Sequence, residues 1–434
     1  MKTYHIWTIG CQMNVADSER LGAALERLEC SPTDVMEEAD IIVLNSCVVR
    51  QGAEDKVAGR LGSLKSVKRR RPETIVALMG CMVGPNTDEL RARFPHTDVF
   101  MRPQEYGDLI RLVEARQGVC IDSSLPLIPS RPSVATFVPI IHGCDKFCTF
   151  CIIPYRRGRE RSRPIAELVT EVEMLARRGV KEVTLLGQNV DSYGHDLPDQ
   201  PDLADLLEAI DGVQAIRRVR FLTSHPNDMS PRIVDAVARL DKVCEFINLP
   251  VQAGDDDVLA AMRRGYTREQ YLALVDRIRV AMPDVGLTTD VIVGFPGETR
   301  SQFQQTMDLV RRVRFDKVHM AMYSPRPGTI AWRRQADDVS QEEKKERHAA
   351  LEAMQTEIAR EINAALVGTT HEVLIEGEKD GRWHGRTRPN KLVYVDGGQR
   401  FHGETVQVEI TEASPYSLRG RALRAAATAI PVAI

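Results

Sequence analysis

The chain has 434 residues, of which 43% are hydrophobic and 27% charged, and its net charge is −3. This length predicts two or three domains with sizeable cores, and the short apolar runs exclude a membrane-spanning protein. The slightly negative charge means that any nucleic-acid contact must come from local basic patches. Because the first residues contain no apolar signal core, we expect a cytoplasmic protein.

The first third of the chain shows apolar stretches that alternate with helix-like segments, as βαβ units do. Parallel strands joined by right-handed crossovers bring their carboxyl ends to one edge of a sheet, where open α/β sheets bind ligands. We therefore predict an open parallel α/β domain over residues 1–118. Its expected strands span residues 5–9, 41–44 and 75–79, and its expected helices span 16–28 and 54–68.

A cysteine follows each of these three expected strands. Cys11, Cys47 and Cys81 would therefore meet at one sheet edge, which favours an iron–sulfur cluster held by these three thiolates. Cysteine is also among the most commonly buried residues, so packing is the alternative for each of them.

The chain contains nine cysteines in all, an odd number. This count indicates reduced thiols and metal ligands rather than a disulfide framework. Three of the cysteines do not recur at a spacing that a metal requires, and we expect them to serve packing. They are Cys30, Cys120 and Cys244.

The central region contains the most informative motif of the chain. Cys144, Cys148 and Cys151 have the spacing C-x3-C-x2-C. Three thiolates can hold three irons of a cubane [4Fe-4S] cluster and leave the fourth iron open, whereas structural zinc takes four closed ligands. His142 is the only close candidate for a fourth zinc ligand. The spacing therefore favours a reactive cluster over a zinc site.

With Phe150 before its last cysteine, this motif resembles the signature of the radical S-adenosylmethionine (SAM) superfamily. The resemblance implies that the open iron chelates SAM and that one electron from the cluster cleaves SAM to a 5′-deoxyadenosyl radical. Such a radical suits a carbon whose hydrogen no protein base can remove at neutral pH. We therefore assign no catalytic side chain beyond the cluster ligands.

Residues 134–364 alternate between strand and helix patterns, which predicts a partial (β/α)6 barrel as the radical SAM core. Barrel chemistry gathers at the carboxyl ends of the strands. The expected strands span residues 137–142, 183–187, 219–223, 246–251, 287–293 and 318–323. Ordinary loop turns are the alternative for the residues that follow these strands. As cofactor contacts at the barrel mouth we predict Gly187, Gln188, Ser224, Gln252 and Arg264.

After an expected helix at residues 341–366, short alternating segments separated by glycines predict a small C-terminal β-barrel over residues 367–428. Its expected strands span residues 372–376, 392–395 and 406–410. We assign no role to the last residues, 425–434.

Beyond the cysteines, the sequence resembles the methylthiotransferase family of radical SAM enzymes along almost its whole length. The resemblance implies an auxiliary [4Fe-4S] cluster on Cys11, Cys47 and Cys81, and it makes the C-terminal barrel a TRAM domain, an RNA-binding module. The shared segments include Gly10-Cys11-Gln12-Met13-Asn14, Asn45-Ser46-Cys47, Gly80-Cys81, Leu185-Leu186-Gly187-Gln188-Asn189-Val190, Thr223-Ser224-His225-Pro226 and Tyr323-Ser324-Pro325-Arg326-Pro327-Gly328-Thr329.

Two basic patches are candidates for RNA contact. One directly follows the central cysteines, and the other lies in the expected TRAM domain. A purely structural barrel is the alternative for the second patch. The predicted RNA-binding residues are Arg156, Arg157, Arg159, Trp383, Arg386 and Arg388.

The family resemblance implies methylthiolation: one SAM donates a methyl group to a sulfur at the auxiliary cluster, and a second SAM supplies the radical. The segments at Cys11 and Gln188 resemble the branch that modifies N6-isopentenyladenosine next to the anticodon of tRNA. The expected partners are therefore a tRNA anticodon stem-loop and an electron donor such as flavodoxin or ferredoxin. The alternatives are the branch that modifies an aspartate of a small-subunit ribosomal protein and a non-catalytic iron–sulfur RNA-binding protein.

Overall fold

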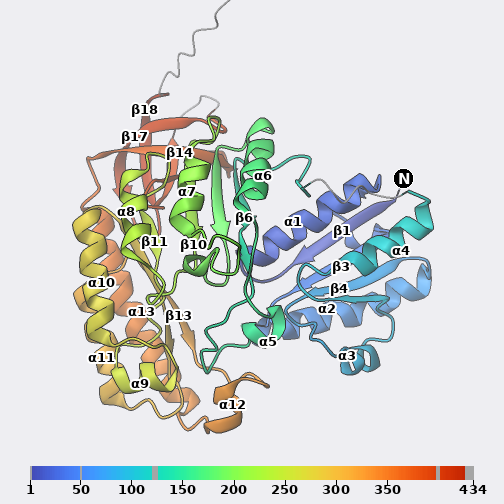
Figure 1. Ribbon diagram of the computed structural model, residues 1–434, viewed down its shortest axis with the longest axis horizontal. Coiled ribbons are helices and arrows are strands. Elements are labelled where there is room, and N and C mark those ends of the chain that lie inside the picture. The colour runs from blue at the N-terminus through green and yellow to red at the C-terminus, as the bar shows by residue number, and fades with distance from the viewer. Residues whose placement is uncertain (1, 49–50, 120–125, 397–400, 426–434) are drawn as a thin grey trace, which may run out of the picture.

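The computed structural model describes residues 2–48, 51–119, 126–396 and 401–425 of the chain. Within these ranges, an N-terminal sheet domain, a central partial barrel and a small C-terminal barrel follow one another (Figure 1). The predicted fold class is therefore confirmed. Cys120 and most of the expected tail, residues 426–434, lie outside the described residues.

The N-terminal domain is built on a parallel sheet in the order β2-β1-β3-β4-β5. Strands β3 and β4 are buried along their whole length, because helices cover both faces of the sheet, and this explains their uninterrupted apolar sequences. The strands are β1 (Thr3–Thr8), β2 (Ser31–Pro32), β3 (Ile41–Ser46), β4 (Ile75–Gly80) and β5 (Val99–Met101).

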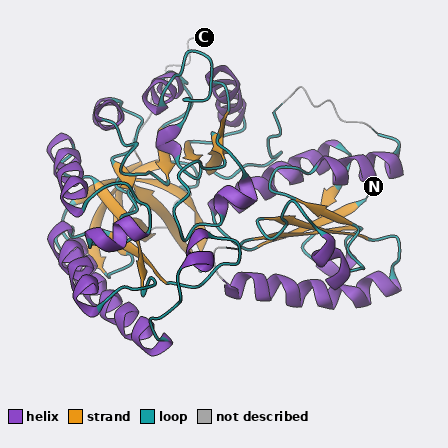
Figure 2. Cartoon of the chain, turned by 60° about the horizontal axis from the view of Figure 1, so that its bottom comes forward, coloured by secondary structure: helices purple, strands orange, loops and turns teal. Residues whose placement is uncertain are grey.

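Two small hydrophobic cores lie on the two faces of this sheet. Ile41 and Val43 of β3 point to the side of α1 and α4, whereas Ile42 and Leu44 point to the side of α2. Figure 2 shows these helices on opposite sides of the sheet. The helices are α1 (Gln12–Arg27), η1 (Met36–Glu38), α2 (Gln51–Arg70), α3 (Asp88–Arg93) and α4 (Gly107–Gln117).

Six parallel strands form the central partial barrel. They make two sheets, β6-β9-β10 and β11-β12-β13, which a bridge between Val219 and Val243 connects. All six predicted strands are present, although the first is interrupted after Pro139 and continues as β7 (Ile141–His142). The six are β6 (Ala135–Pro139), β9 (Glu182–Leu186), β10 (Arg218–Leu222), β11 (Phe246–Asn248), β12 (Gly286–Val293) and β13 (Lys317–Met322).

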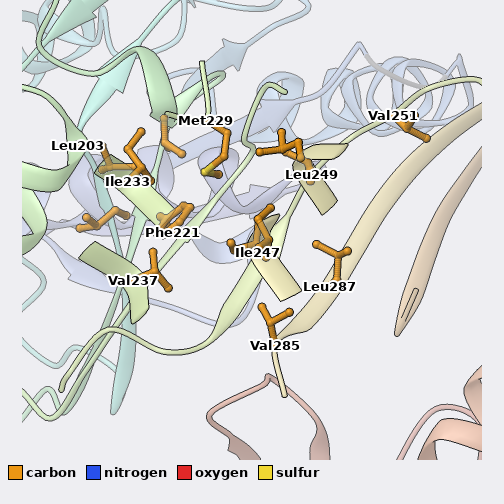
Figure 3. Close-up of a cluster of buried hydrophobic side chains, with 14 of the residues drawn as sticks. Leu203, Phe221, Met229, Ile233, Val237, Ile247, Leu249, Val251, Val285 and Leu287 are labelled. Carbon is orange, nitrogen blue, oxygen red and sulfur yellow. The ribbon is translucent and has the colours of Figure 1, made fainter. Parts of the chain in front are cut away.

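Helices surround these strands on the outside (Figure 2). Figure 3 shows the core between them, where Phe221 of β10 and Ile247 of β11 lie near Ile233 and Val237 of α8. The remaining elements of this region are α5 (Ile153–Arg157), β8 (Arg161–Ser162), α6 (Ile165–Arg177), η2 (Val190–Ser192), α7 (Leu203–Asp211), α8 (Pro231–Arg239), α9 (Asp256–Ala261), α10 (Arg268–Ala281), α11 (Arg300–Val313), α12 (Ile330–Arg334) and α13 (Gln341–Ala364).

The C-terminal region is a closed barrel in the strand order β14-β15-β16-β18-β17. Three of its strands were predicted, and β15 and β18 were missed. β15 contains two arginines and β18 three, so neither shows the apolar alternation of a strand. The strands are β14 (Thr370–Lys379), β15 (Arg382–Thr387), β16 (Leu392–Asp396), β17 (Thr405–Ala413) and β18 (Leu418–Ala425).

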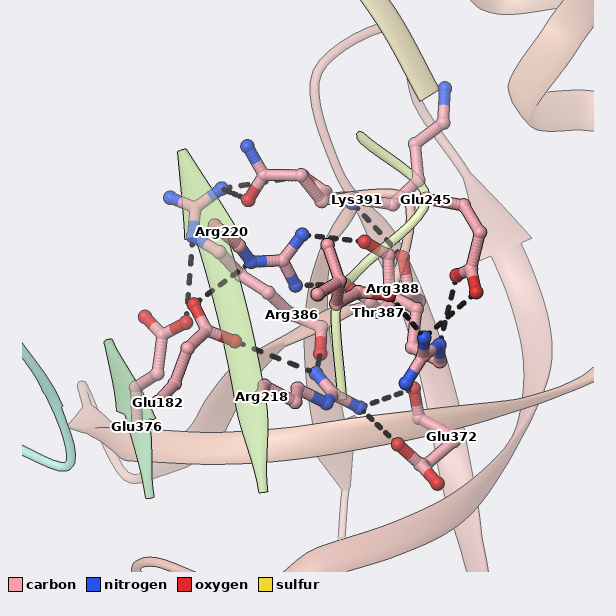
Figure 4. Close-up of polar contacts among 12 residues, drawn as sticks. Glu182, Arg218, Arg220, Glu245, Glu372, Glu376, Arg386, Thr387, Arg388 and Lys391 are labelled. Carbon is pink, nitrogen blue, oxygen red and sulfur yellow. Dashed lines mark hydrogen bonds and ion pairs between the residues drawn. The ribbon is translucent and has the colours of Figure 1, made fainter. Parts of the chain in front are cut away.

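This C-terminal barrel packs against the amino ends of the central strands. Two buried arginines of β10 make the contact (Figure 4): Arg218 Nη1 donates to the Arg386 carbonyl, and Arg220 Nη2 donates to the Thr387 carbonyl, both at 2.7 Å. The opposite, carboxyl ends of the central strands therefore remain available for the loops that contain the cysteines.

Candidate metal centres

Cys11, Cys47 and Cys81, the edge triad, meet at one edge of the N-terminal sheet. Cys11 caps the start of α1 after β1, Cys47 directly follows β3, and Cys81 directly follows β4. Because β1, β3 and β4 are neighbours in the sheet, the three thiols come close enough for their charges to interact. The structure thus brings together the three residues that the strand pattern singled out.

A buried network of amides holds the three strand ends in register. Asn14 Oδ1 accepts from the Cys11 backbone N–H at 3.3 Å, and Asn14 Nδ2 donates to Asn45 Oδ1 at 2.9 Å. Ser46 Oγ accepts from the Met82 backbone N–H at 3.2 Å. Asn14, Asn45 and Ser46 are fully buried, so their hydrogen bonds are made within the protein and fix the loops rigidly.

Glycines before two of these cysteines leave no room for a side chain. Gly80 has a φ of +104°, and a Cβ there would lie 2.4 Å from the Ser46 carbonyl oxygen. At Gly10 a Cβ would lie 2.9 Å from the Cys47 Cβ. Only glycine fits these positions. The glycines therefore allow the backbone of the neighbouring strand ends to pack closely around the three cysteines.

Cys144, Cys148 and Cys151, the loop triad, lie in the single loop between β7 and α5, at the carboxyl ends of the barrel strands. Distant segments hold this loop in place. The Cys144 N–H donates to the Gly158 carbonyl at 3.2 Å, and the Thr149 N–H donates to the Met262 carbonyl at 3.0 Å. The spacing in the sequence therefore becomes a fixed arrangement of three thiols.

Both triads could hold a metal cluster through their three thiols. Burial raises the pKa of the Cys144 and Cys151 thiols to about 12 and that of Cys81 to about 11. At neutral pH such thiols ionise only when a metal binds them. Within the described residues, neither triad has a fourth cysteine, so each could ligate three irons and leave one site open.

Arg264, one of the predicted cofactor contacts, lies directly beside the loop triad. Its Nη1 donates to Cys148 Sγ at 3.3 Å, and its Nη2 donates to the Pro250 carbonyl at 2.8 Å. The guanidinium is buried, so its charge acts on the thiol with little screening by solvent.

The other four predicted contacts follow β9, β10 and β11 around the same barrel mouth. Gln188 Oε1 accepts from the Gly143 N–H at 2.7 Å, and Ser224 Oγ donates to Asp191 Oδ1 at 3.0 Å. These two side chains therefore position neighbouring groups. Gly187 packs against Ile141, and Gln252 has a left-handed φ of +73°.

The basic patch after the loop triad is divided between surface and interior. Arg159 is 75% exposed and pairs with Asp145 at 2.7 Å, which suits a contact to RNA phosphate. Arg156 is half-buried. Arg157 is only 3% exposed and pairs with buried Asp17 at 3.0 Å. The predicted RNA contact of Arg157 does not fit this placement, because its charge is already used inside the protein.

The C-terminal patch needs a similar correction. Arg388 donates to both carboxylate oxygens of Glu245, at 2.7 and 2.8 Å, and so joins the two barrels rather than facing RNA. Arg386 is 39% exposed and lies 3.5 Å from Glu376, and the Trp383 ring packs on Phe401. Arg386 and Trp383 remain partly accessible on the C-terminal barrel.

Sequence reasoning missed the polar residues that organise the edge triad. Asn14 and Asp17 lie on the buried side of α1, and Asn45 is the only amide in the apolar strand β3. A polar side chain at a position where the helical or strand pattern calls for an apolar one was the available signal. The packing predicted for Cys30 and Cys244 is confirmed, since both are buried.

Three family models match the chain: Radical SAM superfamily at residues 138–310, Uncharacterized protein family UPF0004 at residues 3–102, and TRAM domain at residues 364–423. A tRNA-2-methylthio-N(6)-dimethylallyladenosine synthase of Dehalococcoides mccartyi is 49% identical over 98% of this chain and 99% of its own length. The synthase of the same name from Chloroflexus aurantiacus is 50% identical over 96% of this chain and 91% of its own length. The chain belongs to this synthase family.

Family membership makes the chain a radical SAM enzyme with SAM and a [4Fe-4S] cluster as cofactors, and it confirms the C-terminal TRAM domain. The structure of the radical SAM methyltransferase TsrM from Kitasatospora setae matches with a TM-score of 0.59 and 14% identity, covering 76% of this chain and 77% of that one. At this identity the likeness supports the fold alone. Among the described helices, none has the length and apolar character needed to cross a bilayer.

Proposed function

We propose that this enzyme methylthiolates N6-isopentenyladenosine next to the anticodon of tRNA, using SAM as methyl donor and as radical source. The observation that carries the proposal is the presence of two separate cysteine triads at one domain interface. α5 begins two residues after Cys151, and its last residue, Arg157, lies beside Cys81 of the edge triad. Sulfur insertion needs a radical source and a sulfur carrier within reach of one substrate. Two triads at one interface could hold one of these groups each.

In this proposal each triad ligates one [4Fe-4S] cluster through its three cysteines. Cys144, Cys148 and Cys151 would hold the cluster that binds SAM, and together these groups would supply radical chemistry for hydrogen removal from the adenine carbon. Arg264 supports this site through its hydrogen bond to Cys148 Sγ. Gln188 holds the Gly143 backbone, and thereby keeps the start of the cysteine loop against β9. Ser224, Gly187 and Gln252 stay our predictions for cofactor contacts at the barrel mouth.

The same proposal includes the remaining partners. The tRNA would bind across the exposed Arg159 and the accessible Arg386 and Trp383 of the TRAM domain, with the target base unpaired. A flavodoxin or ferredoxin would supply the electron, in the cytoplasm. We place the domain limits at residues 1–118, 134–364 and 367–428.

An anaerobic assay tests the proposal. Reconstituted enzyme is incubated with isopentenylated tRNA, SAM and a reductant, and the digested RNA is searched by mass spectrometry for a methylthio adduct on the modified adenosine. We expect the adduct with the natural chain and its loss with Cys148→Ala and with Cys47→Ala. Formation of 5′-deoxyadenosine without any RNA product would contradict the tRNA assignment and favour a ribosomal-protein substrate.

A further inference from the structure

Arg157 belongs to the radical SAM half of the chain, but its side chain lies in the interface with the N-terminal domain. It is the last residue of α5, its side chain is 3% exposed, and its Nη2 donates to Asp17 Oδ2 at 3.0 Å. Asp17 comes from α1, the helix that begins at Cys11 of the edge triad. The helix that follows the loop triad therefore delivers a cation to the other triad.

One terminal nitrogen of this guanidinium makes no hydrogen bond of ordinary geometry among the described residues, although the guanidinium interacts with the Cys81 thiol. Arg157 Nη1 is buried and finds no hydrogen-bond acceptor among the described residues. The Cys81 thiol lies beside the guanidinium, and Cys11 lies within range of its charge. Buried donors are nearly always satisfied in folded proteins, so this unsatisfied N–H of a guanidinium beside a cysteine triad indicates an acceptor that arrives with the bound group.

Further hydrogen bonds hold Asp17, the partner of the Arg157 guanidinium, in place. Gln104 Nε2 donates to Asp17 Oδ1 at 3.1 Å and lies 2.6 Å from His142 Nδ1, two residues before Cys144. Asp17 is fully buried and receives both donors. These contacts hold the Arg157 guanidinium in one orientation, with Nη2 toward Asp17.

We propose that Arg157 is a positioning residue of the auxiliary cluster: its Nη1 donates a hydrogen bond to a sulfur of the cluster held by Cys11, Cys47 and Cys81. The inference rests on the proposed function, since it requires that cluster. Hydrogen bonds and positive charge at cluster sulfurs favour the reduced state and raise the reduction potential. Arg157 would thus set the potential of the auxiliary cluster from the radical SAM half.

The test measures the auxiliary cluster alone. The full chain with Cys144, Cys148 and Cys151 all changed to alanine serves as the parent, and it is reconstituted with iron and sulfide. Arg157→Gln and Arg157→Lys are introduced into this parent, and the reduction potential is measured by EPR-monitored titration. Arg177→Gln is the matched control, because Arg177 is 76% exposed on α6 and pairs only with Glu173 in the described residues.

We expect Arg157→Gln to load iron and to lower the potential, so that the ratio of reduced to oxidised cluster at a fixed potential falls at least tenfold, about 59 mV for one electron. Arg157→Lys keeps the charge without the planar fork and should recover part of this shift, and Arg177→Gln should cause none. A potential in Arg157→Gln equal to that of the parent would overturn the inference.

Two further outcomes are informative. If Arg157→Gln does not load iron, the reduction potential of Arg157→Lys decides the question. A potential below that of the parent supports the hydrogen bond, and a potential equal to that of the parent refutes it. Should the parent itself hold no cluster, the auxiliary cluster of the proposed function is contradicted, and the inference about Arg157 with it.

Discussion

The two cysteine triads reach the same ligand set by different routes. The loop triad comes from one short loop between β7 and α5, whereas the edge triad is assembled from the ends of three strands that are distant in the sequence. The loop depends on hydrogen bonds to remote segments, and the edge triad depends on the register of β1, β3 and β4 with its buried amides. Each site should therefore be breakable without loss of the other.

Substitution of two glycines should have the largest effects on cluster binding and stability. At Gly143, with a φ of +78°, a Cβ would lie 2.1 Å from the Arg159 carbonyl oxygen, and at Gly80 it would lie 2.4 Å from the Ser46 carbonyl oxygen. We expect Gly143→Ala to remove the loop-triad cluster and Gly80→Ala to remove the edge-triad cluster, each with a cost of about 3 kcal/mol in unfolding free energy. Iron analysis and denaturant unfolding measure both effects.

Gly179→Ala is the control for this pair. Gly179 also has a positive φ, +94°, but a Cβ there would meet nothing within 4 Å. It should cost about 1 kcal/mol and leave the iron content unchanged. An equal loss of iron in all three variants would mean that general strain, not local geometry, governs cluster binding.

The buried amides provide the next smaller effect. Asn45→Ala leaves Asn14 Nδ2 without its Asn45 partner and removes the donors to Ser18 and to the Asn14 carbonyl. We expect a loss of about 2 kcal/mol or more and weaker iron retention at the edge triad. For comparison, Thr149→Val removes one hydrogen bond of the cysteine loop, to the Ala261 carbonyl, and should cost about 1 kcal/mol. Urea unfolding measures both, and equal effects would argue against a special role of the amide network.

The sequence predicted the two triads because strand ends and cysteine spacing are local properties of the chain. Cys47 and Cys81 each closely follow an apolar run, and the central cysteines are contained in one loop. The strands of the partial barrel were also predictable, because short segments with apolar residues alternate regularly with helix patterns along this part of the chain.

What the sequence could not supply were contacts between distant segments. Arg157 and Arg159 are equivalent in a sequence, yet one is buried against Asp17 and the other is exposed, because only the packing of α5 on the N-terminal sheet separates them. Arg388 looked like an RNA contact until its pairing with Glu245 appeared. Charge in a sequence reveals the presence of a cation but not its partner.

A buried carboxyl at the barrel mouth predicts a pH dependence of stability. Asp191 accepts from Ser224 Oγ at 3.0 Å and from the His225 N–H at 2.9 Å, and burial raises its pKa from 3.8 to about 8. Between these pH values the unfolded carboxyl is ionised while the folded one keeps its proton. The free energy of unfolding should therefore fall as pH rises, by at most about 1.4 kcal/mol per pH unit.

Urea unfolding of the natural chain and of Asp191→Asn at pH 6 and pH 7.5 measures this dependence. We expect a smaller decrease in the variant, because an amide does not ionise. The same pH dependence in both proteins would show that another group is responsible.

The smallest effect concerns tRNA. Arg159→Gln removes an exposed cation beside the loop triad, so it should weaken tRNA binding a few-fold and reduce the slope of log affinity against log salt by about one unit. Arg177→Gln, an equally exposed change away from the triads, should leave binding nearly unchanged. Filter binding across a salt series measures both, and an unchanged slope in Arg159→Gln would remove this residue from the RNA surface.

The most direct test of the account is the iron content of two triple variants, measured with their ability to cleave SAM. The natural chain should hold about eight irons, and each variant with one triad changed to alanine should hold about four. The variant that lacks Cys11, Cys47 and Cys81 should still form 5′-deoxyadenosine, and the variant that lacks Cys144, Cys148 and Cys151 should not. Full iron content after removal of the edge triad would contradict the claim that two independent clusters serve one reaction.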